Sequence, residues 1–250
     1  MKTVILQSDI LWADPAGNIR KADDAISSVP GADLYILPEM FSTGFCTSPE
    51  GIAETDGFSL DWMKRKSAQC GAAIAGSVAG LADGKYYTLF YFVKPDGEVV
   101  SYDKKHLFTY GKEHEAFTAG DSRVIVEYLG VRILLEICYD LRFPVWSRNC
   151  GDYDMIIYVA SWPASRISAW NSLLVARAIE NQCYVVGVNR VGDDPSNSYS
   201  GGSKIVDPYG NVIACCPDGA ESHSVADIDM EMLEAFRRKF PVLNDADRII

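Results

Sequence analysis

The sequence predicts an α/β fold in which mixed β-sheets are covered by helices. Short runs rich in β-branched and aromatic residues alternate with amphipathic helical stretches along the chain. Several of these runs are nearly all apolar, which is typical of strands buried on both faces. Other runs are joined by tight turns as hairpins, so a uniformly parallel barrel is not expected.

The first part of the chain alternates strands and helices. The second helix is followed by Gly71, a residue suited to a helix C-cap. We expect, in order, a strand at 3–7, a helix at about 18–28, a strand at 33–37, a helix at 59–69 and a strand at 72–78.

The remainder of the chain mixes hairpins with one long helix. Three hairpins are predicted, and the first two turn around Pro95-Asp96-Gly97 and around Leu129-Gly130. Residues 192–203 are polar and glycine-rich, which is typical of a loop. The other predicted elements are strands at 155–160 and 183–188, a helix at 165–181, a hairpin turning at 207–210 and a helix near 230–239.

The chain is predicted to form one domain. Its 250 residues contain no Pro/Ser/Gly-rich or charge-block linker, so we expect a single domain over 1–250. Residues 241–250 lack a clear pattern and are interpreted as a C-terminal tail that docks on a partner or on a second subunit.

Charge and composition narrow the classes of function. The 23 basic and 34 acidic residues give a net charge of −11, which disfavours nucleic acids and anionic membranes as partners. No apolar stretch approaches the roughly 20 residues that span a bilayer, and no signal peptide is recognised. The seven cysteines lack C-x-x-C spacing, which indicates free thiols and a cytoplasmic protein.

Three predicted strands end in a side chain that can take part in catalysis. Glu39 follows Leu-Tyr-Ile-Leu-Pro, Lys104 follows Val-Val-Ser-Tyr-Asp, and Cys138 follows Arg-Ile-Leu-Leu-Glu-Ile. Sites gather at strand ends in α/β proteins because the sheet holds them rigidly. A thiol nucleophile needs a base, and the oxyanion formed by carbonyl attack needs a cationic or N–H donor. We also expect the turn after Cys138 to lower the pKa of its thiol through backbone N–H groups.

Each of these residues also has a structural interpretation. From spacing alone, burial in the core is favoured for Cys138 and a solvated face shared with Lys105 for Lys104, while an ion pair explains Glu39 as well as catalysis does. His106 lies near two further acidic residues, but the chain has no H-E-x-x-H motif, and no metal site is predicted. The glycine-rich segments match no nucleotide-binding pattern.

Taken in order, the motifs resemble those of the nitrilase (carbon-nitrogen hydrolase) superfamily. The resemblance covers nearly the whole chain. It rests on Leu37-Pro38-Glu39-Met40-Phe41, Tyr102-Asp103-Lys104-Lys105-His106-Leu107-Phe108 and Ile137-Cys138-Tyr139-Asp140-Leu141-Arg142-Phe143-Pro144, with Ala160-Ser161-Trp162-Pro163, residues 176–182 and Asp207-Pro208-Tyr209-Gly210 as further matches. It implies a four-layer α-β-β-α sandwich, with two sheets face to face, that commonly forms dimers through its outer helices.

The resemblance also implies roles for individual residues. Cys138 is the nucleophile, Glu39 the general base and acid, and Lys104 the group that stabilises the oxyanion together with the backbone N–H of Tyr139. Glu113 matches a second glutamate of the family, which keeps the lysine charged and positions the amide. The implied reaction proceeds through a thioester and requires neither a metal nor an organic cofactor.

Within the superfamily, the motifs look most like those of omega-amidases. These enzymes hydrolyse the terminal amides of small 2-oxo acids such as 2-oxoglutaramate and 2-oxosuccinamate. The substrate carboxylate requires a local cation, for which Arg166 is the first candidate and Arg142 the second, although either arginine can be purely structural. The aromatic residues that are expected to form the pocket wall, unless they belong to the core, are Phe41, Phe45, Phe117 and Trp162.

Two alternatives remain open at this point. An N-carbamoyl amine hydrolase or another aliphatic amidase would use the same catalytic residues with a different pocket wall. A binding module that retains the fold without activity is a more remote alternative, because Glu39, Lys104, Cys138 and Glu113 are all present.

Overall fold

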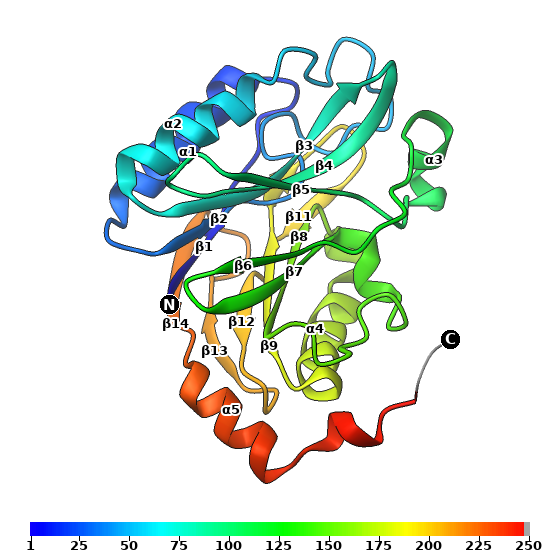
Figure 1. The fold of residues 1–250 in the computed structure, drawn as a ribbon. Coiled ribbons are helices and arrows are strands. Elements are labelled where there is room, and N and C mark those ends of the chain that lie inside the picture. Colours follow the sequence, from blue (N-terminus) through cyan, green and yellow to red (C-terminus); the bar gives the residue numbers. More distant parts are fainter. Residues whose placement is uncertain (248–250) are drawn as a thin grey trace.

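The computed structural model describes residues 1–247 and has four layers (Figure 1). Helices α1 (Pro15–Ser28) and α2 (Phe58–Cys70) form one outer layer, and α4 (Ile167–Asn181) lies on the opposite side. Two six-stranded sheets lie between them. The α-β-β-α arrangement expected from the sequence is therefore confirmed.

The first sheet has the strand order β14-β1-β2-β3-β4-β5. The central strands β1, β2 and β3 are parallel, whereas β14, β4 and β5 each pair antiparallel to a neighbour. The strands are β1 (Lys2–Gln7), β2 (Leu34–Ile36), β3 (Ala73–Ala82), β4 (Lys85–Val93), β5 (Val99–Asp103) and β14 (Ser222–Asp227).

The second sheet has the strand order β13-β12-β9-β8-β7-β6. It is again parallel at its centre, over β7, β8 and β9, and antiparallel at both edges. The strands are β6 (Ile125–Tyr128), β7 (Val131–Ile137), β8 (Met155–Ala160), β9 (Tyr184–Asn189), β12 (Lys204–Val206) and β13 (Val212–Cys215).

The alternation of side chains along each strand explains how the layers pack. On β1, Val4 and Leu6 contact the α1 and α2 layer, while Ile5 between them faces the other sheet. On β8, Ile157 lies between the sheets and Ile156 packs with the α4 side. Both faces of these strands are apolar because both are covered.

Local signals set the ends of the helices. Helix α1 begins three residues earlier than expected, because Asp14 accepts a hydrogen bond from the Gly17 N–H and Pro15 occupies the first helical position. Helix α2 ends at Gly71, whose φ of 66° is the left-handed cap that the sequence indicates.

Two parts of the chain differ from the expectation. Residues 192–203 are not entirely loop, since β10 (Val191–Asp193) and β11 (Ser198–Ser200) form a small hairpin of their own. Strand β14 is absent from the prediction because its residues alternate between partly buried and exposed and are mostly polar.

The C-terminal part begins with helix α5 (Met230–Lys239), which lies at the predicted position. Leu233 of this helix joins the core between the sheets, and a short 3-10 helix follows at Val242–Asp245. Of the predicted tail 241–250, residues 248–250 lie outside the described residues. None of the helices within residues 1–247 has the length and apolar character that crossing a bilayer requires.

Candidate active site

The three strand-end residues predicted from the sequence converge at one place between the two sheets. Glu39 follows β2 and Lys104 follows β5, both in the first sheet, while Cys138 directly follows β7 in the second. The Nζ atom of Lys104 lies 2.8 Å from Oε1 of Glu39, and both side chains are fully buried. Charged groups at this depth require partners, which each supplies to the other.

Glu113 completes the buried cluster. It opens the one-turn helix α3 (Glu113–Ala116), and its two carboxylate oxygens lie 3.0 and 2.9 Å from Lys104 Nζ. Thr88 donates to Oε1 at 3.0 Å and the Phe108 N–H donates to Oε2 at 2.6 Å. Lys104 is therefore held between two carboxylates, and Glu113 is fixed by hydrogen bonds from two separate segments.

The backbone is strained where Cys138 and Glu39 are presented. Cys138 has a φ of 46° and Met40, which follows Glu39, has a φ of 45°. Such left-handed conformations are uncommon for residues other than glycine. The turn at Cys138 starts the 3-10 helix Cys138–Arg142, where the N–H of Tyr139 lies in the first turn and has no intrahelical acceptor.

The charges in the cluster shift one another's pKa values. Burial raises the pKa of Glu39, and Lys104 opposes this effect only in part. For Lys104, burial alone would lower the pKa, but the Glu113 and Glu39 carboxylates outweigh it and raise the pKa above the usual value. The lysine is therefore a stable ammonium, and Glu39 is a better proton acceptor than an exposed carboxylate.

The thiol differs from the expectation of a lowered pKa. Burial raises the pKa of Cys138 well above its usual value, the Glu39 carboxylate raises it further, and Lys104 lowers it only in part. A hydrogen bond with the backbone of Ser161 also lowers the pKa, but burial outweighs this effect. At neutral pH the resting thiol is protonated, so its attack on a carbonyl requires a base.

The two adjacent lysines are in different environments. Lys104 is fully buried against Glu39 and Glu113, with its Nζ 5.3 Å from the centre of the Phe45 ring. Lys105 is partly exposed and lies 5.3 Å from the centre of a Trp146 ring instead. Successive side chains at the end of β5 point to opposite sides, so only Lys104 is directed towards Cys138.

A pocket opens directly over Cys138 and Lys104. Two arginines, Arg142 and Arg166, contribute to its wall, and within residues 1–247 neither guanidinium has a hydrogen-bond or ion-pair partner. Arg142 lies over the Trp162 ring at 4.8 Å, and Arg166 over the Phe108 ring at 5.3 Å. The remaining lining residues are Phe45, Tyr139, Ser161, Pro163, Asn197 and Tyr199.

The aromatic residues predicted for the pocket wall divide into two groups. Phe45 and Trp162 line the pocket, as expected. Phe41 does not, because it packs on the outer face of the first sheet at 5.8 Å from the ring of Trp62. Phe117 belongs to a separate buried cluster with Met40 and Cys46.

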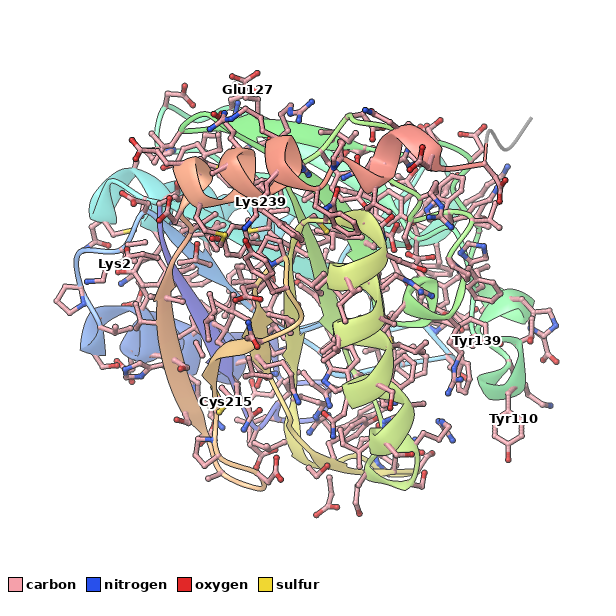
Figure 2. The ribbon with its side chains drawn as sticks, turned by 90° about the horizontal axis from the view of Figure 1, so that it is seen from below. Lys2, Tyr110, Glu127, Tyr139, Cys215 and Lys239 are labelled. Carbon is pink, nitrogen blue, oxygen red and sulfur yellow. The ribbon has the colours of Figure 1, made fainter. Side chains whose placement is uncertain are left out.

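Several pocket residues were not predicted. Asn197 and Tyr199 belong to the β10–β11 hairpin, where the sequence predicts a loop, and no local pattern marks them. In the sequence Ser161 is only part of a motif, yet in the structure its N–H donates to Oε2 of Glu39 at 2.8 Å. Figure 2 shows Tyr139 and Tyr110 on the same side of the molecule, with Tyr110 projecting outwards near the pocket rim, where Arg166 lies 5.9 Å from its ring.

Within residues 1–247, no group of three or more His, Cys, Asp or Glu residues is arranged to hold a metal ion.

The fold is that of a hydrolase of the nitrilase superfamily. A family model described as carbon-nitrogen hydrolase matches residues 3–238. The chain belongs to the carbon-nitrogen hydrolase family, whose members act on carbon-nitrogen bonds other than peptide bonds.

Relatives named as amidases match this chain over nearly their full length. The chain is 44% identical to omega-amidase YafV of Escherichia coli strain K12 over 99% of this chain and 97% of that protein. It is 36% identical to the 2-oxoglutaramate amidase of Bacillus subtilis over 96% of this chain and 95% of that one. A solved CN-hydrolase superfamily protein of Xanthomonas campestris, which carries an arsenic adduct in its active site, matches with a TM-score of 0.97 at 38% identity, covering 100% of this chain and 98% of that one.

Proposed function

We propose that this chain is an omega-amidase that hydrolyses the terminal amide of small 2-oxo acid amides, such as 2-oxoglutaramate and 2-oxosuccinamate, to a 2-oxo dicarboxylate and ammonia. The observation that carries the proposal is the pair of guanidiniums of Arg142 and Arg166 in the wall of the pocket that contains Cys138, which have no hydrogen-bond or ion-pair partner among residues 1–247. Similarity to an omega-amidase and to a 2-oxoglutaramate amidase supports the same substrate class.

The charges around the pocket favour a 2-oxo acid over a 2-amino acid. Glu39 and Glu113 are both engaged by Lys104, and Asp194 accepts hydrogen bonds from the Tyr199 hydroxyl and the Ser196 N–H. Among residues 1–247, no free carboxylate lines the pocket to balance an ammonium group. A substrate carboxylate meets the arginines, whereas the ammonium of glutamine meets two guanidiniums of the same charge.

We propose that Cys138 is the nucleophile and Glu39 the base. The carboxylate of Glu39 takes the thiol proton as the sulfur attacks the amide carbon, which forms a tetrahedral oxyanion. Glu39 then returns the proton to the departing ammonia, leaving a thioester. Water, deprotonated by the same carboxylate, attacks the thioester, and the proton passes back to the Cys138 sulfur as the acid product leaves.

We assign the oxyanion to Lys104 and to the backbone N–H of Tyr139. An ammonium has three N–H donors. One donates to Glu39, and the two oxygens of Glu113 at 2.9 and 3.0 Å are close enough together to share another. The third N–H is then free for the oxyanion, while the two carboxylates hold the ammonium in place.

We also propose that the chain is a single domain over 1–250 and acts in the cytoplasm as a homodimer or a higher homo-oligomer. All seven cysteines are free, which is typical of a reducing compartment. Helix α4 forms an outer layer of the fold, where Ile179 has 52% of its surface exposed and is available to a second subunit.

The proposal is tested by ammonia release from 2-oxoglutaramate, 2-oxosuccinamate, glutamine, N-carbamoyl-β-alanine, an aliphatic amide and a nitrile. We expect turnover of the two 2-oxo amides and none with Cys138→Ala. Turnover confined to another of these substrates would keep the catalytic assignment and reject the pocket assignment. An inert wild type would instead favour a binding module.

A pair of arginine variants isolates the carboxylate contact. We expect Arg166→Gln to raise KM for 2-oxosuccinamate by about 10-fold to 100-fold, which corresponds to the free energy of one charge-assisted hydrogen bond. The KM for the aliphatic amide should not change. Arg20, an exposed residue of α1, provides the matched control Arg20→Gln, which is expected to change neither substrate. Equal losses on both substrates would assign Arg166 a structural role.

A further inference from the structure

One buried carboxylate connects the segment that carries Lys104 to the turn that carries Cys138. Asp140 is fully buried, two residues after Cys138. Its Oδ2 accepts hydrogen bonds from the Tyr102 hydroxyl at 2.8 Å and from the Ile137 N–H at 2.9 Å. Its Oδ1 accepts from the His106 N–H at 2.9 Å and lies 2.8 Å from His106 Nδ1.

These partners flank the two reactive groups. Tyr102 lies two residues before Lys104 and His106 two residues after it, while Ile137 immediately precedes Cys138. Asp140 therefore joins both sides of the lysine segment, in the first sheet, to the last residue of β7 in the second sheet.

The partners of Asp140 are themselves fixed. The Tyr102 hydroxyl accepts from the Lys105 N–H at 3.0 Å and from Trp146 Nε1 at 3.3 Å. The His106 ring stacks on Phe143 with 3.8 Å between ring centres and an interplanar angle of 10°. A network of this kind restricts how the lysine segment and the cysteine turn can move relative to each other.

We propose that Asp140 is a positioning residue for catalysis, which holds Lys104 and the Cys138 sulfur at the separation that the reaction requires. This rests on the proposed function, in which both groups act on one carbonyl. Asp140 itself does not line the pocket and acts through its neighbours. Misplacing a reacting group by about 1 Å costs on the order of 100-fold in rate, so a tether at this junction affects catalysis directly.

The Asp140→Asn variant tests the proposal because an amide preserves the shape of the side chain but not its acceptors. An NH₂ group replaces one oxygen of the carboxylate. This group is a donor and cannot accept the hydrogen bonds that the N–H and O–H groups around it donate to Asp140. We expect kcat for 2-oxosuccinamate to fall about 100-fold while KM changes by less than about threefold. The rate at which iodoacetamide alkylates Cys138, followed by mass spectrometry of its peptide, should also fall.

Asp154→Asn is the matched control. Asp154 is also buried and accepts four hydrogen bonds, from Arg132 and Arg237, but it precedes the far end of β8. Both variants are expected to melt at lower temperatures, and only Asp140→Asn to lose kcat and Cys138 reactivity. Unchanged kcat and alkylation in Asp140→Asn, or equal losses in both variants, would overturn the proposal.

Tyr102→Phe keeps the test available if Asp140→Asn does not fold. It removes one hydroxyl from the network and leaves the packing of the ring, so we expect a smaller loss in kcat with KM retained. A Tyr102→Phe protein with wild-type kcat and alkylation rate would count against the proposal. The alkylation readout needs no substrate, so failure of the omega-amidase assignment would be seen separately, as a wild type that releases no ammonia while Cys138 still reacts.

Discussion

Glu113→Gln removes one charge from the buried cluster and changes little else. The glutamine oxygen can accept from Lys104 and from the Phe108 N–H, while its amide nitrogen can donate to the Thr88 hydroxyl. The contact between Lys104 Nζ and Oε1 at 3.0 Å is lost, because the amide nitrogen that takes this position cannot accept a hydrogen bond. The other hydrogen bonds are kept, so most of the loss is electrostatic.

The cost can be worked out from the distances. At 2.9 Å and an effective dielectric constant of about 20, the attraction between Lys104 and Glu113 is about 6 kcal/mol. Glu39 bonds the same Nζ atom, so the two carboxylates lie about 5 Å apart and repel each other by about 3 kcal/mol. The substitution removes both interactions, and we expect a net loss of about 2 to 3 kcal/mol in the free energy of unfolding, or about 5 to 10 °C in Tm.

Activity should fall as well. Without Glu113, the pKa of Glu39 is lowered, because the like charge that raises it is gone, and Glu39 becomes a weaker base. The ammonium also loses the partner that holds it in place. We expect kcat/KM for 2-oxosuccinamate to fall about 100-fold.

Thermal unfolding and ammonia release measure the two effects. Glu115→Gln, two residues further along, is the matched control, because Glu115 is exposed and its 4.0 Å contact with Lys112 contributes little. A Glu113→Gln protein with wild-type Tm and turnover, or a control that loses as much, would refute the electrostatic reasoning.

Three further predictions follow from other parts of the structure. Lys104→Ala is expected to abolish ammonia release while Lys105→Ala retains it, and comparable losses in the two variants would contradict the orientation of these side chains at the pocket. Burial and the nearby Asp140 raise the pKa of Glu136 to about 8, above its value in the unfolded chain, so its contribution to stability is complete below about pH 4 and is lost as pH rises towards 8. Glu136→Gln should therefore gain in Tm over the wild type between pH 5 and pH 8, and a constant difference would argue against the shift. Leu129 is exposed, has a φ of 49° and precedes Gly130 in a hairpin turn that favours Asn-Gly, so we expect Leu129→Asn to raise Tm by about 1 to 3 °C. A lower Tm would mean that the Leu129 side chain contributes packing.

The central strands and the three strand-end residues could be predicted from the sequence. An apolar run of strand length that stops at a charged or nucleophilic residue is a local signal, and Glu39, Lys104 and Cys138 each carry it. A local pattern cannot show that these three residues meet in one site, because their meeting depends on two sheets that face each other. Only the resemblance to a known family predicted that they meet.

The pocket wall was harder to predict for the same reason. Tyr199 and Asn197 lie on a hairpin that distant contacts hold in place, with the buried Arg190 side chain 4.5 Å from the Tyr199 ring and bonded to the Ile10 carbonyl. Phe41 and Phe117 are aromatic residues like Phe45, but the packing of each ring depends on neighbours elsewhere in the chain. Edge strand β14 has no apolar period to reveal it.

The pairing of β14 with β1 has a consequence for how the protein folds. Lys2 lies opposite Asp227 in this antiparallel pair, so the first strand of the chain obtains one of its two neighbours only after nearly all of the chain has been synthesised. Contacts of such sequence separation slow folding, because a large loop must close before they form. Until then β1 has an open edge that is prone to aggregation, and on the ribosome it has to remain unpaired on that side.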